Sequence, residues 1–213
     1  GEGDQGRSDS GRDGEKTMRV FIDSADVNEI REAIKLGLAD GVTTNPTLIA
    51  KAGVDLERTI RTIADIVEGP VNAEVTATTL HGILEEGRRF HAWAPNVYVK
   101  IPLNHEGLIA CRTLAAEGIR STMTLVFSPA QAILAAKARA AYICPFIGRL
   151  DDTGYDGMEL IRTISKIYRE DIDFSTQVLA ASVRSPVHVV EAARAGADAV
   201  TVAFSIIRQM MQH

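Results

Sequence analysis

A lysine inside an apolar run is the side chain of this sequence with the clearest capacity for covalent chemistry. Lys100 lies within VYVKIP, directly between Val99 and Ile101. Apolar neighbours remove water from an amine and favour its neutral form, which is the form that attacks a carbonyl to give a Schiff base. The alternative is a lysine that pairs with Glu74 or Asp23 and only fills space. Position alone does not decide between these two interpretations.

Other polar residues that could act on a carbonyl substrate also end or interrupt apolar runs. Asp23 closes RVFID, whereas Glu74 and Thr124 lie within VNAEV and STMTL. Thr43 and Asn45 follow the apolar start of GVTTN. A charged side chain that faced outward from a buried strand would meet apolar helices, which is costly without a partner. We therefore expect this group to point inward and to converge with the lysine.

A second cluster of polar residues follows the late apolar runs. It contains Arg149, Ser182 and Arg184, and the next residues, Ser185 and Pro186, are typical of a helix start. Guanidinium groups bind phosphate oxygens in pairs, and the amides of a helix N-terminus can add further donors. The cluster therefore predicts a phosphate site. The alternative is a set of solvated surface arginines.

One pattern repeats eight times from residue 18 onward: a short β-branched apolar run, a polar turn and a stretch with helical apolar spacing. The expected strands are Arg19–Asp23, Gly41–Thr44, Val71–Val75, Val97–Ile101, Ser121–Leu125, Tyr142–Phe146, Asp173–Ala180 and Ala199–Val202. The expected helices are Val27–Leu36, Leu56–Val67, Leu80–Ala92, Leu108–Glu117, Pro129–Ala138, Gly157–Arg169, Pro186–Arg194 and Ser205–Met211. Asp26 and Glu29 have capping-box spacing, and Gly37, Gly118 and Gly196 lie just past helices.

Eight such units predict an α/β protein with a single compact (β/α)8 TIM barrel of parallel strands over residues 18–213. An open doubly wound sheet is disfavoured because no GxGxxG follows the first strand. The active site of such a barrel lies at the carboxyl ends of its strands, where the polar residues above are found. Residues 1–17 contain no aliphatic or aromatic side chain, which predicts a disordered polar extension, either a natural leader or an added remnant.

Charge and composition argue against several classes of protein. A net charge of −5 argues against a nucleic-acid binder. No apolar run reaches the roughly 18 residues of a membrane span, and no signal peptide is visible, so we expect a cytoplasmic protein without a membrane partner. The five histidines have no metal-binding spacing, so we expect no metal site. The two cysteines, Cys111 and Cys144, lie in apolar stretches and are expected to be reduced core residues.

Six stretches in this order resemble the small transaldolases and the related fructose-6-phosphate aldolases over residues 18–213. They are FIDSAD (21–26), DGVTTNPTLIA (40–50), VKIP (99–102), TLVFSPAQA (124–132), CPFIGRLDD (144–152) and LAASVRSP (179–186). The resemblance implies a class I aldol-type enzyme. Such an enzyme acts on phosphorylated sugars and, because a protonated Schiff base is its electron sink, needs no cofactor and no metal.

The resemblance also implies a role for each polar residue of the barrel mouth. Lys100 looks like the Schiff-base lysine, and Asp23 looks like the acid/base that handles the C4 hydroxyl proton. Glu74 and Thr124 resemble the pair that holds a catalytic water. The other matches are to residues that orient the dihydroxyacetone unit, Thr43 and Asn45, and to residues that bind phosphate, Arg149, Ser182 and Arg184.

Two positions separate the sister activities of the family that the chain resembles. Transaldolases have glutamate at the water-holding position and phenylalanine before the late arginine, whereas the aldolases have glutamine and tyrosine. This chain has Glu74 and Phe146. A phenol could protonate the enamine and release dihydroxyacetone, but Phe146 offers no proton, so the intermediate waits for an aldehyde acceptor. The resemblance thus favours a transaldolase, with a fructose-6-phosphate aldolase or a catalytically silent sugar-phosphate-binding barrel as alternatives.

The chain departs from this pattern at three places. Thr122 stands where transaldolases commonly have asparagine, and Cys144 stands where many have serine. The sequence stops at His213, whereas family members usually continue through a helix that packs on a neighbouring subunit. We expect a homo-oligomer, with a ring-type assembly weakened by the short C-terminus.

Overall fold

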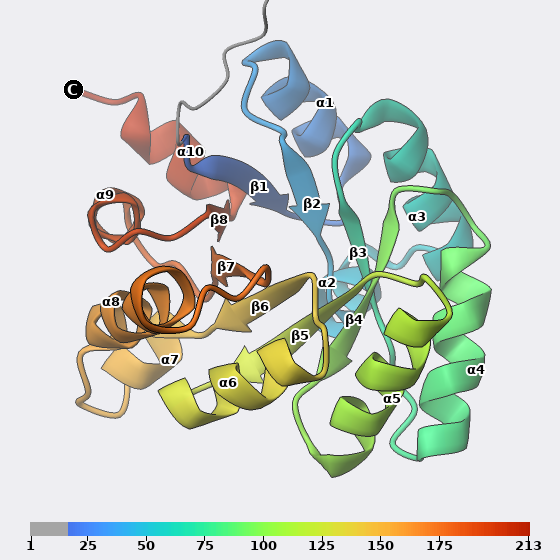
Figure 1. Cartoon of the computed structure of the whole chain (residues 1–213). Helices are drawn as coiled ribbons and strands as arrows, with labels where there is room; N and C mark the ends of the chain where they lie inside the picture. Colours follow the sequence, from blue (N-terminus) through green and yellow to red (C-terminus); the bar gives the residue numbers. More distant parts are fainter. Residues whose placement is uncertain (1–16) are drawn as a thin grey trace, which may run out of the picture.

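Eight parallel strands form a closed barrel in which each strand is hydrogen-bonded to its neighbours in chain order, and the eighth strand pairs with the first. The computed structural model describes residues 17–213. Helices surround the strands in Figure 1, and the predicted compact (β/α)8 barrel is confirmed. The predicted disordered extension lies, apart from residue 17, outside the described residues.

The strands are short and nearly all their residues are buried, as expected for a sheet that is covered on both faces. Their bounds are β1 (Arg19–Asp23), β2 (Gly41–Thr43), β3 (Val71–Glu74), β4 (Val97–Pro102), β5 (Ser121–Val126), β6 (Tyr142–Pro145), β7 (Gln177–Ala180) and β8 (Ala199–Val202). The predicted start of the seventh strand at Asp173 is wrong. The chain there leaves helix α8 (Gly157–Lys166) through a π-helical turn, and Asp173 has a positive φ of 59°.

Side-chain caps begin most of the helices, and prolines occupy the first turn of three. The helices are α1 (Val27–Lys35), α2 (Pro46–Ala52), α3 (Leu56–Ile66), α4 (Leu80–His91), α5 (His105–Ala116), α6 (Pro129–Lys137), α7 (Ile147–Asp151), α8 (Gly157–Lys166), the π-helical η1 (Ile167–Asp171), α9 (Pro186–Arg194) and α10 (Phe204–Met210). Helices α2 and α7 were not predicted. The predicted glycines, Gly37, Gly118 and Gly196, have the positive φ of helix ends.

The predicted capping box at α1 is only half formed. Asp26 caps the helix by accepting a hydrogen bond from the backbone N–H of Asn28. Glu29 does not reach back to the N–H of Asp26, because Ser24 lies between them: the Ser24 hydroxyl donates to Glu29 and accepts from Asp26 N. This relay fixes the chain directly after Asp23.

Two apolar clusters divide the core. The larger one fills the space between the strands and the surrounding helices. The smaller one lies inside the barrel and comprises Phe21, Tyr98, Tyr142, Cys144, Leu179, Ala181 and Ala199. Because strand residues alternate between the two faces, the inward positions two residues further along several strands are polar. The barrel interior therefore has an aromatic floor and a polar mouth.

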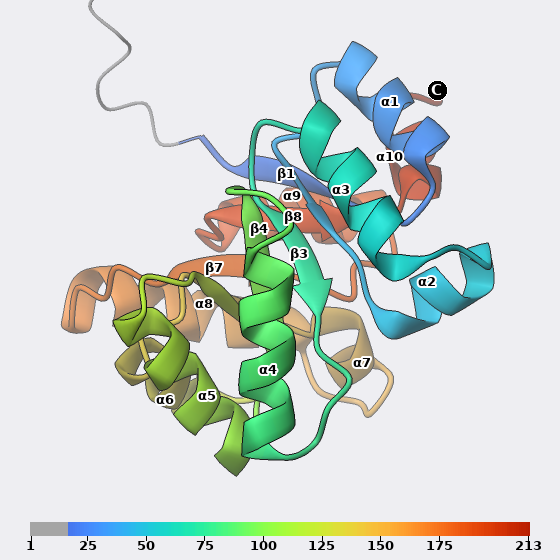
Figure 2. The same ribbon diagram turned by 90° about the vertical axis from the view of Figure 1, so that its right-hand side faces the viewer.

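The mouth is bordered by the two helices that the sequence did not predict. Figure 2 shows α2 and α7 on the right-hand side of the barrel. None of the α2 residues is buried, whereas α7 buries Ile147 and Gly148. Within residues 17–213, no helix is long and apolar enough to cross a membrane.

Candidate active site

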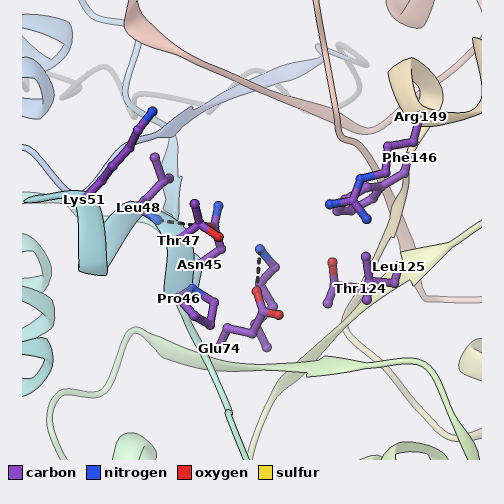
Figure 3. A pocket seen from close by; sticks show the side chains of 11 residues that line it. Asn45, Pro46, Thr47, Leu48, Lys51, Glu74, Thr124, Leu125, Phe146 and Arg149 are labelled. Carbon is purple, nitrogen blue, oxygen red and sulfur yellow. Dashed lines mark hydrogen bonds and ion pairs between the residues drawn. The ribbon is translucent and has the colours of Figure 1, made fainter. Parts of the chain in front are cut away.

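The register of β3 and β4 brings Glu74 beside Lys100, and both residues line the cavity at the barrel mouth. Figure 3 shows the Glu74 side chain in this cavity. The Lys100 ammonium lies 3.2 Å from Glu74 Oε2 and donates a hydrogen bond of 3.0 Å to the carbonyl of Thr44. Only 5% of the lysine is exposed. The lysine is therefore buried, held at two points and adjacent to a carboxylate that can take its proton.

Asp23 is placed in the same mouth by the pairing of β1 with β2, in which it is opposite Thr43. The Thr43 hydroxyl donates to Asp23 Oδ1 at 2.8 Å and lies 2.6 Å from the Thr201 hydroxyl. The Thr43 hydroxyl has one hydrogen, which it donates to Asp23, so the Thr201 hydroxyl must donate to the Thr43 oxygen. Burial raises the pKa of the Asp23 carboxyl, although the Lys100 ammonium and the Thr43 hydroxyl act in the opposite direction. Asp23 is thus tuned to hold a proton more readily than an ordinary carboxyl.

Thr124 lies beside a break in the barrel ladder. The register of β5 against β6 shifts between Met123 and Val126, and Leu125 has a positive φ of 59°. The Thr124 hydroxyl is buried and has no hydrogen-bond partner among the described residues. Buried hydroxyls are normally satisfied, so this one is available to a ligand or a water molecule in the mouth.

Two adjoining cavities open at the mouth and share four residues: Asn45, Lys100, Phe146 and Arg149. The larger has a volume of about 490 Å³, and its lining is shown in Figure 3. The smaller, of about 220 Å³, is lined by residues of six strands or their following loops: Asp23, Thr43, Asn45, Lys100, Cys144, Phe146, Arg149, Ala181, Ser182, Arg184 and Thr201. Each predicted site residue lines at least one of the two cavities.

The predicted phosphate-binding residues come from α7 and from the loop after β7. Arg149 stacks over the Phe146 ring at 5.2 Å from its centroid and has no ion pair within residues 17–213. Ser182 has a positive φ of 57°, which is a strained conformation for serine. Arg184 forms an exposed ion pair of 2.9 Å with Asp152. Asp152 therefore holds Arg184 and not Arg149.

Asn45 both caps a helix and lines the two cavities. Its side-chain oxygen accepts a hydrogen bond of 2.9 Å from Leu48 N and so caps α2. Its position between the two cavities leaves the amide nitrogen to a ligand (Figure 3). The sequence Asn45-Pro46 is a helix-start signal that could have predicted α2. With that helix, Thr47, Leu48 and Lys51 would have been recognised as mouth residues.

The two unusual residues of the mouth differ in their access to a ligand. Thr122 lies below both cavities, where its hydroxyl contacts the buried Asn72 side chain. Cys144 lines the smaller cavity, and burial raises the pKa of its thiol to about 12, so it is a neutral, unreactive wall. Within the part of the chain that the structure describes, no three His, Cys, Asp or Glu side chains gather in a way that could hold a metal.

Comparison with known families gives a match over almost the whole described region. The sequence model of a family described as Transaldolase/Fructose-6-phosphate aldolase matches residues 20–213. A "Probable transaldolase" of Anaeromyxobacter dehalogenans (strain 2CP-C) is 54% identical over 196 residues, which cover 92% of this chain and 90% of that protein. Proteins with the same name from Myxococcus xanthus (strain DK1622) and Caldicellulosiruptor saccharolyticus are 54% and 50% identical, covering 92% of this chain and 88% and 90% of theirs.

Solved structures with distant sequences share the architecture. A thiamine phosphate pyrophosphorylase from Pyrococcus furiosus superposes with a TM-score of 0.59 at 17% identity, covering 88% of this chain and 86% of its own. A mandelate oxidase mutant with a monooxide FMN adduct superposes with a TM-score of 0.61 at 14% identity, covering 89% and 64%. At such identities these likenesses describe the barrel alone.

Proposed function

The chain belongs to the transaldolase/fructose-6-phosphate aldolase family, and from this premise we propose that it transfers a dihydroxyacetone unit between sugar phosphates through a Schiff base on Lys100. The donor is a ketose phosphate such as fructose 6-phosphate or sedoheptulose 7-phosphate. The acceptor is an aldose phosphate such as erythrose 4-phosphate or glyceraldehyde 3-phosphate. The observation that carries the proposal is the buried lysine amine 3.2 Å from a carboxylate in a polar barrel mouth.

Formation of the Schiff base needs a neutral amine and a route for protons. Glu74 lies close enough to take the ammonium proton of Lys100. The amine then attacks the C2 carbonyl, and the carbinolamine loses water when its hydroxyl is protonated. The unpartnered hydroxyl of Thr124 lies in the same cavity and can hold the water that carries these protons.

Cleavage of the carbon–carbon bond needs a base at the C4 hydroxyl. Asp23 takes that proton, the C3–C4 bond breaks, and its electron pair moves into the iminium to give an enamine on the lysine. The aldose phosphate leaves, and the enamine attacks the carbonyl of the acceptor by the reverse path. A raised pKa suits Asp23 to this task, because the same carboxyl must return the proton during addition.

The ends of the substrate are recognised by different groups. Asn45 and the Thr43 hydroxyl border the region next to Lys100 and orient the hydroxyls of the dihydroxyacetone unit. Arg149, Ser182 and Arg184 receive the phosphate at the other end. Phe146 lies between these regions and has no acidic proton, so the enamine survives until an aldehyde arrives. This favours transfer over release of free dihydroxyacetone.

A trapping experiment tests the lysine, and an acceptor test separates transfer from cleavage. Borohydride with fructose 6-phosphate should leave a dihydroxyacetone adduct on Lys100, detected by peptide mass, and Lys100→Ala should lower turnover to the detection limit. An adduct on another lysine contradicts the mechanism. Consumption of fructose 6-phosphate should require erythrose 4-phosphate, since acceptor-independent cleavage would identify an aldolase. Binding of sugar phosphate without any turnover would identify a silent barrel.

A further inference from the structure

His188 lies outside both cavities but contacts the two segments that carry the proposed phosphate-binding residues. Its Nε2 is 2.9 Å from Asp151 Oδ2, at the end of α7. Its Nδ1 accepts a hydrogen bond of 3.1 Å from the backbone N–H of Arg184, in the loop after β7. The His188 side chain is 16% exposed, whereas its partner Asp151 is 40% exposed.

These contacts indicate which ring nitrogen carries the hydrogen. A nitrogen that accepts the Arg184 N–H cannot carry a hydrogen of its own, so the hydrogen is on Nε2 and points at Asp151. The second oxygen of Asp151 accepts the N–H of Gly157, which anchors the carboxylate at the start of α8. His188 thus connects a fixed acid to a loop that lies at the mouth.

The loop that His188 holds is closely fitted to α7. Ile147 N and Gly148 N donate to the carbonyls of Ala181 and Ser182 at 3.0 and 2.9 Å. A Cβ on Gly148 would lie 2.2 Å from the Ser182 carbonyl, so the two segments approach as closely as a glycine allows. Ser182 is itself in a strained left-handed conformation, which persists only where its surroundings over-determine it.

The side-chain ion pair between the same segments is a weaker restraint. Arg184 and Asp152 are 51% and 60% exposed, and ion pairs of this kind contribute little. A phosphate that binds the Arg184 guanidinium also competes with Asp152 for it. The hydrogen bond from Arg184 N to His188 is independent of that competition because it uses the backbone.

We propose that His188 is a positioning residue that holds Arg184 and Ser182 in register with Arg149, so that all three meet one phosphate monoester. This inference rests on the proposed function and deepens it. It assigns to a residue outside the cavities an effect on phosphate binding, with no part in the chemistry at Lys100.

Three substitutions separate the two contacts of the ring. His188→Ala removes both. His188→Asn keeps an acceptor near the position of Nδ1, for Arg184 N, and His188→Gln keeps a donor near the position of Nε2, for Asp151. His81→Ala is the matched control, because His81 is also paired with an acid, Glu85 at 3.9 Å, but is exposed and lines neither cavity.

The expected signature is a loss confined to phosphate. His188→Ala should raise KM for fructose 6-phosphate at least tenfold with kcat changed less than threefold, and should weaken binding of inorganic phosphate by a similar factor in calorimetry. The rate of borohydride trapping of dihydroxyacetone, which has no phosphate, should be unchanged. The Asn and Gln variants should lie between His188→Ala and wild type, and the control should match wild type.

Two results would overturn the inference. Equal losses in phosphate binding and in dihydroxyacetone trapping would indicate a general structural role, and unchanged phosphate binding in folded His188→Asn and His188→Gln as well as His188→Ala would indicate none. Phosphate titration requires no turnover, so it also separates this inference from the proposed function. A wild-type protein that binds phosphate through His188-dependent contacts but transfers nothing would retain the inference and refute the transferase proposal.

Discussion

The two ends of the barrel interior hold cations in different ways. At the floor, the Arg19 guanidinium donates to Gln177 and lies over the rings of Tyr142 and Phe21, at 5.3 and 6.0 Å from their centroids. At the mouth, Lys100 has a carboxylate and one carbonyl, and the nearby Thr124 hydroxyl has no partner within the described chain. At the floor, protein groups alone surround the cation. At the mouth, the Thr124 hydroxyl remains available to a ligand.

The mouth also contains two residues in the left-handed backbone region. Leu125 and Ser182 have positive φ values and line the mouth cavities, where each such residue costs on the order of 1 to 3 kcal/mol. At the floor, a Cβ at Gly41 would lie 2.7 Å from the Phe21 ring, and the glycine makes room for it.

Asp23→Asn should give the largest effect on this contrast. Loss of the base should lower kcat by about 10²- to 10⁴-fold. Because the folded-state pKa of Asp23 is raised, its ionisation opposes folding, and this cost appears as pH rises above the ordinary carboxyl pKa. The Asn variant should therefore have a higher free energy of unfolding at neutral pH and no advantage in acid. Urea titrations at both pH values measure this, and a less stable variant at neutral pH would contradict it.

Phe21→Ala, at the floor, should lower stability strongly and leave the catalytic pH dependence unchanged. The ring is fully buried and packs against Tyr142, so its removal should lower the free energy of unfolding by about 3 to 5 kcal/mol. The pH dependence of kcat, measured on the protein that remains folded, should be unchanged. A shifted profile with little loss of stability would mean that the floor and the mouth are not separable.

Arg19→Met tests the floor cation more gently. The variant keeps an apolar stem over the rings but loses the cation–π contacts and the bond to Gln177, which should cost about 1 to 2 kcal/mol. Thermal unfolding measures the loss. Activity at saturating substrate should match wild type, and a drop in kcat would show that the floor cation acts on the chemistry.

Thr43→Val should give the smallest effect, a shift in pH dependence. The hydroxyl lowers the pKa of Asp23 by donating to it, so its removal should raise that pKa further. The acid limb of the kcat profile should then move to higher pH. Thr113→Val, at an exposed hydroxyl that bonds within α5, is the control. An acid limb that stays in place would show that Thr43 does not tune the base.

The sequence was most informative where local signals and burial agree. The Ser185-Pro186 start and Gly196 end predicted α9 to the residue, and the strand pattern predicted the inward positions of Lys100 and Glu74. Two short helices were not predicted: α2 buries no residue, and α7 has no side-chain cap.

Long-range contacts within the candidate site escaped as well. His188 contacts Asp151, which lies far away in the sequence at the end of α7, and no periodicity reveals this contact. The unpartnered Thr124 hydroxyl and the strain at Leu125 likewise depend on a bulge that composition does not encode.

Helix α2 has a consequence for how this protein can change over generations. Thr47, Leu48 and Lys51 line the larger cavity, yet the helix that carries them contributes no buried side chain to the core. Substitutions at exposed positions usually alter stability by less than about 0.5 kcal/mol. Substitutions in α2 can therefore change the shape and charge of this wall with little loss of barrel stability. Over generations, such substitutions can alter which substrates the cavity accepts.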